Sequence, residues 1–75
     1  MVYFSHMANL QITLNGEDRE VPAVATLNDL LHHLGLDART VVVEHNRHVV
    51  RRAALAHTPL AAGDSVELVH FVGGG

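Results

Sequence analysis

The residues with the clearest chemical potential lie at the end of the chain, where an apolar run stops in three glycines. The sequence there reads His70-Phe71-Val72-Gly73-Gly74-Gly75, and Gly75 carries the terminal carboxylate. Glycine has no side chain to pack, so an extended glycine tail can enter a narrow slot in another protein. What such a tail delivers is its carboxylate. The ending is therefore interpreted either as a delivered, reactive carboxylate or as an ordinary frayed terminus.

Histidine is the other chemically active residue type, with seven in 75 residues. His32 and His33 are adjacent on a predicted helix and point about 100° apart, so they cannot chelate one ion well. His45 and His48 flank a predicted turn and could approach each other, but no third ligand follows at a recognisable spacing. We therefore expect no metal site. His70 fits either a partner contact or a plain strand histidine.

The composition disfavours several classes of function. Cysteine is absent, which removes disulfides, thiolate metal sites and cysteine nucleophiles. All five basic residues are arginine, so no lysine is present for Schiff-base chemistry. A net charge of −3 argues against nucleic acid as a partner. No nucleophile, base and orienting group form a recognisable set, so we expect a carrier or binding protein and not an enzyme.

Length and segment patterns set the expected organisation of the chain. Seventy-five residues allow one domain with one small core. The chain has no apolar run long enough to cross a membrane and no secretory leader, so we expect a cytoplasmic protein with no membrane partner. Residues 1–7 are expected to be vector-derived or disordered, residues 8–72 to form the domain, and residues 73–75 to form a flexible tail.

The first part of the domain reads as a hairpin of two strands. Leu10, Ile12 and Leu14 alternate with polar residues, which predicts a half-buried strand. Asn15-Gly16 predicts a two-residue turn, because both residues tolerate the positive φ that this turn needs. The return strand is expected from Glu17 to about Pro22.

A short helix is expected next. Thr26 begins it, and Asp29 completes a near capping box. Gly35 ends the helix, and Leu36 can reach back to Leu31 in a Schellman contact. The apolar stripe of this helix consists of Leu27, Leu30, Leu31 and Leu34.

The second half of the chain alternates strands with short connections. The expected order is a strand at 41–45, a turn at Asn46-Arg47, a strand at 48–50, one helical turn within 51–60, a turn at 62–64 and a final strand at 65–72. The final strand is the most apolar, so we expect it at the centre of the sheet and parallel to the first strand. One helix covering a mixed sheet of four to five strands is an α+β, β-grasp arrangement.

Alternation along the final strand assigns its side chains to two faces. Val66 and Leu68 are expected to face the helix, which places Val69 and Phe71 on the open face together with Val42 of the third strand. Exposed apolar patches on small proteins often mark a partner surface. The alternatives are self-association or apolar surface residues without a role.

Three stretches of this sequence resemble a known family. They are Leu14-Asn15-Gly16-Glu17, the run from Val41 to Arg52 and the run from Gly63 to Gly75. Over residues 8–75 the chain resembles the ubiquitin-like sulfur carriers, and most of all the ThiS family of the thiamine pathway. It departs from that pattern at Arg51, where the family usually has proline, and in having three terminal glycines in place of two.

The resemblance implies a protein co-substrate that binds no cofactor itself. A ThiF-like adenylating enzyme would use ATP to adenylate the carboxylate of Gly75, and a sulfur-donating enzyme would supply the sulfur that replaces AMP. The resulting thiocarboxylate would pass its sulfur to a ThiG-like thiazole synthase. Contacts with these partners are expected at Val42, Val69, His70, Phe71, Val72, Gly73 and Gly74.

Three other functions compete with this one. A molybdopterin-type sulfur carrier would use the same chemistry with a different acceptor, although the residues before the glycines favour the thiamine carriers. A β-grasp interaction module would make no chemical use of its tail. A protein modifier would be joined through its tail to lysines of target proteins.

Overall fold

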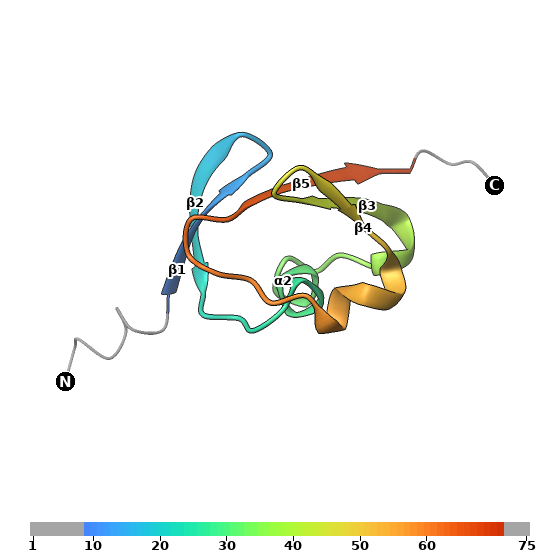
Figure 1. Cartoon of the computed structure of the whole chain (residues 1–75), viewed down its shortest axis with the longest axis horizontal. Helices are drawn as coiled ribbons and strands as arrows, with labels where there is room; N and C mark the ends of the chain where they lie inside the picture. The colour runs from blue at the N-terminus through green and yellow to red at the C-terminus, as the bar shows by residue number, and fades with distance from the viewer. Residues whose placement is uncertain (1–8, 72–75) are drawn as a thin grey trace.

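The computed structural model describes residues 9–71, and the elements follow the predicted order. Figure 1 shows a hairpin, a helix, a second hairpin and a final strand, linked by two short 3-10 helices. The elements are β1 (Asn9–Leu14), β2 (Glu17–Pro22), α2 (Leu27–His33), η1 (Ala38–Thr40), β3 (Val41–His45), β4 (His48–Val50), η2 (Arg52–His57) and β5 (Ser65–His70).

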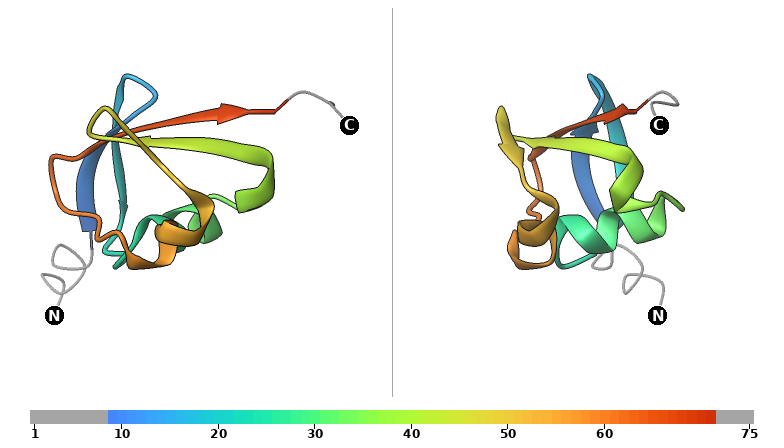
Figure 2. Two further views of the ribbon diagram at one scale, coloured as in Figure 1. Left: turned by 45° about the vertical axis from the view of Figure 1, so that its right-hand side comes forward. Right: turned by 90° about the vertical axis from the view of Figure 1, so that its right-hand side faces the viewer.

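The strands form one mixed sheet in the order β2-β1-β5-β3-β4. β5 lies at its centre, parallel to β1 and antiparallel to β3, as its apolar sequence predicts. In both views of Figure 2, α2 and η2 lie on the same side of the sheet. The predicted α+β, β-grasp fold is therefore confirmed, and within residues 9–71 no helix covers the other face of the sheet, which we call the open face.

The core lies between this sheet and α2, and aliphatic side chains build it. No polar or charged residue is buried among residues 9–71. Leu30 of α2 and Val66 of β5 have no exposed surface, and Leu55 of η2 belongs to the same core at 2% exposure. The other buried residues are Ile12, Leu14, Val21, Leu27, Leu31, Val41, Val43, Leu60 and Leu68.

The turns and helix caps that the sequence predicts are present in the structure. Asn15 and Gly16 both have positive φ, 51° and 84°, as a two-residue hairpin turn requires. At the end of α2, the Leu36 N–H donates to the Leu31 carbonyl at 2.9 Å and the Gly35 N–H to the His32 carbonyl at 3.1 Å, the Schellman pattern. The capping box at Thr26 is also present.

The structure differs from the prediction in the end of the last strand and in two short helices. β5 ends at His70, two residues before the predicted end, although the Phe71 N–H still donates to the Thr40 carbonyl at 2.9 Å. η1 was not predicted; Asp37 caps it by accepting a hydrogen bond from the Arg39 N–H at 2.8 Å. η2 is longer than one turn and is a 3-10 helix. Predictions for residues 1–8 and 72–75 lie outside the described residues.

Candidate functional site

The open face of the sheet carries apolar side chains where β3 and β5 lie side by side. Val42 of β3 is directly opposite Val69 of β5. Val69 is 60% exposed and Phe71, which follows β5, is 61% exposed, whereas Val42 is half-buried. The structure therefore brings Val42 and Val69 together on the open face, and it rules out a core position for Phe71.

Val49 of β4 was not predicted as part of this surface, yet it is 67% exposed. It lies opposite Glu44, so it shares the open face with Val42 and Val69. The signal was present in the sequence: a two-residue turn at Asn46-Arg47 pairs residue 45 with 48 and therefore residue 44 with 49. We call Val42, Val49, Val69 and Phe71 the open-face patch.

Carboxylates border the open-face patch. Glu44 of β3 lies directly opposite Glu67 of β5, on the same face as Val69. At the β2 edge of the same face, Asp18 and Glu20 lie opposite Thr13 and Gln11 of β1 and also point away from the core. Like charges directly opposite each other on neighbouring strands are unfavourable, so the Glu44–Glu67 pair costs the free chain some stability.

The remaining predicted site residues divide into two groups. His70 lies opposite the buried Val41, and it is exposed on the helix side of the sheet, away from the open-face patch. Its contact with a partner stays a prediction. Val72, Gly73, Gly74 and Gly75 lie outside the described residues.

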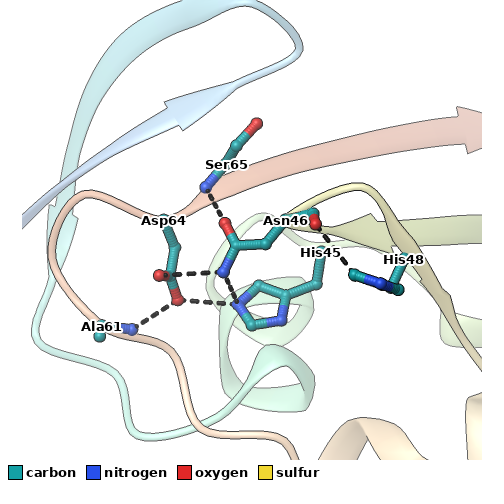
Figure 3. A network of polar contacts seen from close by, with 6 residues as sticks. All are labelled: His45, Asn46, His48, Ala61, Asp64 and Ser65. Atoms are coloured by element: carbon teal, nitrogen blue, oxygen red, sulfur yellow. Dashed lines mark hydrogen bonds and ion pairs between the residues drawn. The ribbon is translucent and has the colours of Figure 1, made fainter.

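A polar network fixes the start of β5 against the turn between β3 and β4 (Figure 3). The His45 Nε2 lies 2.7 Å from the Asp64 Oδ2, and both side chains are only 16% exposed. A carboxylate can only accept, so this nitrogen must carry the proton. The Asn46 side chain donates to the Asp64 Oδ1 at 3.2 Å and accepts from the Ser65 N–H at 2.9 Å. The network therefore ties together residues about 20 positions apart.

The pKa of Asp64 reflects this network. Burial acts to raise the pKa of this carboxyl, but the hydrogen bonds from His45, the Ala61 N–H and Asn46 together outweigh burial. The pKa of Asp64 is therefore lower than its usual value, and the carboxyl is ionised at neutral pH.

The two histidines that flank the turn have separate hydrogen-bond partners in the structure. His45 and His48 are opposite each other in the hairpin, but the His45 ring binds Asp64 while the His48 Nδ1 binds the Asn46 carbonyl at 3.0 Å. Among residues 9–71, no three His, Cys, Asp or Glu side chains gather as metal ligands would. Within the same residues, no helix is both long and apolar enough to cross a membrane.

Comparison with known proteins places this arrangement in context. The model of the ThiS family matches residues 12–75. The sulfur carrier protein ThiS of Bacillus subtilis is 35% identical over 65 residues, which cover 85% of this chain and 98% of that protein. A crystal structure of the thiamine biosynthesis protein ThiS from Geobacter metallireducens has a TM-score of 0.74 and 35% identity, covering 88% of this chain and 100% of that one.

Longer proteins also contain a region like this chain. The thiazole synthase of Paramagnetospirillum magneticum is 39% identical over 66 residues, and that of Magnetococcus marinus is 42% identical over the same length. The matched region covers 88% of this chain but spans only 20% of the length of each of these synthases.

Proposed function

This chain belongs to the ThiS family, and from that premise we propose that it is a sulfur carrier of thiamine biosynthesis. The observation that carries the proposal is the match along 98% of the Bacillus subtilis sulfur carrier, a protein of about this size. In this function the chain is a co-substrate of other enzymes and not a catalyst.

The reacting group is the carboxylate of Gly75. A carboxylate is a poor electrophile, so a ThiF-like enzyme first activates it with ATP. One carboxylate oxygen attacks the α-phosphorus of ATP, pyrophosphate leaves, and an acyl adenylate forms. Sulfur at the oxidation level of sulfide, supplied by a sulfur-donating enzyme, then attacks the carbonyl carbon, AMP leaves, and a thiocarboxylate remains. ATP is therefore bound by the partner and not by this chain.

The open-face patch gives these partners a surface to hold. Phe71 stands two residues before Gly73, so a partner that binds Phe71 is already close to the residues that its active site must receive. Aromatic side chains are over-represented among the residues that dominate binding energy at interfaces. The exposure of Phe71 and Val69 supports this role.

The acceptor of the sulfur is proposed to be a thiazole synthase. Two proteins of that name contain a region similar to this chain within a much longer sequence. A region retained in one polypeptide with the rest of a synthase is expected to act close to it, because linkage raises the effective concentration of the two parts. This supports a ThiG-like enzyme as a partner of the chain.

Intact-mass measurement tests the proposal. The chain is incubated with a ThiF-like adenylating enzyme, ATP and sulfide, and a gain of about 16 Da is expected as sulfur replaces oxygen. Omitting ATP is the matched control and should leave the mass unchanged. No gain in the complete mixture would reject the proposal.

The same experiment distinguishes the competing functions. Thiocarboxylated chain is next given to a thiazole synthase with its other substrates, and the added mass should be lost again. Loss only to a molybdopterin precursor would identify the other class of carrier. Attachment of the chain to lysines of added proteins would identify a modifier, and a chain that is never activated would be an interaction module.

A further inference from the structure

The backbone of β5 presents its hydrogen-bonding groups alternately to its two neighbours. On the β3 side, the Phe71 N–H donates to the Thr40 carbonyl at 2.9 Å, and the Ser65 carbonyl accepts from the Asn46 N–H at 2.8 Å. Because this alternation has a period of two, residues 65, 67, 69 and 71 direct their backbone groups to β3. Residues 66, 68 and 70 direct theirs to the opposite side.

On that opposite side, β1 accompanies only the first part of β5. The parallel pairing consists of Thr13 with Ser65 and Leu14 with Val66. The Asn15 N–H then donates to the Val66 carbonyl at 2.9 Å, and the Leu68 N–H donates to the side-chain oxygen of Asn15 at 2.7 Å. The Asn15 side chain thus makes the last bond before the chain turns away into β2.

Beyond Asn15, the edge of β5 is without a neighbouring strand. Among residues 9–71 no strand pairs with this side of β5 after Val66, so the Leu68 carbonyl and both backbone groups of His70 face outward. Figure 1 shows β5 running on past the β1–β2 hairpin with β3 alone beside it. An unpaired strand edge is a template for a further strand.

We propose that this edge, from Leu68 to His70, is completed by an extended segment of the adenylating enzyme, which adds to the sheet as a strand next to β5. The occupant follows from what comes after the edge. Gly73, Gly74 and Gly75 have no side chains, so a protein that receives them can recognise only their backbone. His70 is three positions before Gly73 in the sequence, so an enzyme segment paired with His70 is close to the residues that the enzyme must receive.

The other two edges of the sheet fit this role less well. β2 carries charged residues at four of its six positions and ends at Pro22, which has no N–H to donate. β4 has only three residues. Neither of these edges leads into the glycine tail, whereas β5 does.

Amide hydrogen exchange tests the proposal, measured by NMR on the full chain alone and in complex with a ThiF-like enzyme. In the free chain, the His70 N–H should exchange fast, while the Leu68 and Val69 N–H groups are protected by Asn15 and β3. In the complex, the His70 N–H should become protected by at least about tenfold. A His70 N–H that still exchanges fast in the complex would overturn the proposal.

A second copy of this chain is the competing occupant of the edge. It would protect the His70 N–H in the free chain, and the protection would increase with protein concentration. That result would also overturn the proposal, because the edge would then be occupied without the enzyme.

A pair of substitutions at one position separates the backbone from the side chain. His70→Pro removes the outward N–H without removing a bond to β3, whereas His70→Ala keeps the N–H and removes the imidazole. With thermal melts like that of the parent chain, His70→Pro should bind the enzyme at least about tenfold more weakly than His70→Ala does. Equal losses in the two variants would mean that the side chain is recognised, and would reject the added strand. If His70→Pro fails to fold, the exchange measurement decides.

This inference rests on the proposed function, and the experiments separate the two. The inference is rejected alone if the parent chain gains sulfur and binds the enzyme while the His70 N–H stays unprotected. If the parent chain neither binds the enzyme nor gains sulfur, the proposed function is rejected, and the proposed enzyme segment at the edge of β5 is rejected as well.

Discussion

Phe71 is the single residue whose position matters most for the proposed function. Its neighbours Val69 and Val72 are also apolar, but only an aromatic side chain at the end of β5 offers a large contact area this close to the glycines. The backbone of Phe71 is held by Thr40, while its side chain is 61% exposed. The residue is therefore fixed in place and available to a partner.

Phe71→Ala should weaken binding to the adenylating enzyme at least about tenfold, since a buried aromatic anchor commonly contributes 2 kcal/mol or more. The free energy of unfolding should change little, because most of the Phe71 side chain is exposed to solvent. A titration against the enzyme and a denaturant melt of the same variant check the two halves of this prediction. Unchanged affinity would show that Phe71 is not an anchor.

Asp64 is the residue that should make stability depend on acid pH. Its pKa is lower in the folded chain than in the unfolded chain, so its contribution is present above about pH 4 and is lost as the pH falls through the folded pKa. Asp64→Asn should lower the free energy of unfolding at pH 7 by about 1–3 kcal/mol, the usual cost of losing hydrogen bonds to a charged group. The variant should also show a weaker decline in stability below pH 4.

Asp37→Asn is the matched control for the acid measurement. Hydrogen bonds from Arg39 lower the pKa of Asp37 to about 2, but the Asp37 side chain is 44% exposed, compared with 16% for Asp64. Water screens such an ion pair, so its removal should change stability less than Asp64→Asn does. Urea melts at several pH values between 2 and 7 give both comparisons. An equal loss in the two variants would contradict the importance assigned to the His45–Asp64 contact.

At the scale of elements, α2 is a short helix that depends on its ends and on its buried face. A helix of seven residues is too short to be stable alone, so the caps at Thr26 and Gly35 and the packing of the leucine stripe must hold it. Leu27, Leu30 and Leu31 are all nearly inaccessible to water. The helix therefore forms only when it lies against the sheet.

Leu31→Ala should cost about 2–5 kcal/mol, because it leaves a cavity between α2 and the sheet. A domain of this size has only about 5 kcal/mol in total, so a loss at the upper end of this range would leave the variant largely unfolded. His32→Ala, on the exposed face of the same helix, is the control and should change stability by less than about 0.5 kcal/mol. Chemical denaturation measures both. A loss below about 1 kcal/mol for Leu31→Ala would contradict its place in the core.

The pairing of β3 with β5 is the second element that can be tested directly. Glu44 and Glu67 are opposite each other, and Glu67 is exposed on the open face. Glu67→Gln removes the like-charge pair and should raise the free energy of unfolding by about 0.2–1 kcal/mol at low salt. The gain should shrink as added salt screens the repulsion in the parent chain. A variant less stable than the parent at low salt would show that the two carboxylates do not repel each other across the strands.

At the scale of the whole molecule, the core ends several residues before the carboxylate that we propose as the reacting group. The last core side chain is Leu68, and Gly74 and Gly75 follow six and seven residues later. Deleting both glycines should therefore abolish sulfur loading and leave the thermal melt unchanged. Intact-mass measurement and a melt of the shortened chain check this prediction. A shortened chain that still gains sulfur would contradict the assignment of Gly75 as the reacting residue.

The sequence by itself determined the five strands, the main helix and their order, but not the short helix η1. Asn15-Gly16, the capping box at Thr26 and Gly35 are local signals, since each depends on the φ and ψ preferences of a few neighbouring residues. Alternation along the last strand also assigned Val69 and Phe71 to the exposed face, because the two faces of a strand repeat every second residue. The resemblance to the ThiS family also came from the sequence, and the family match confirms it, whereas the chemistry of the tail stays a prediction.

Only the tertiary structure decided where the strands stop pairing and which distant groups meet. The bond from the Leu68 N–H to Asn15 joins residues 53 positions apart, and the contact between His45 and Asp64 spans 19. No local preference encodes such contacts, because they depend on the register of the whole sheet and on the length of each connection. For the same reason, the open edge of β5 at His70 becomes visible only once β1 has been placed beside it.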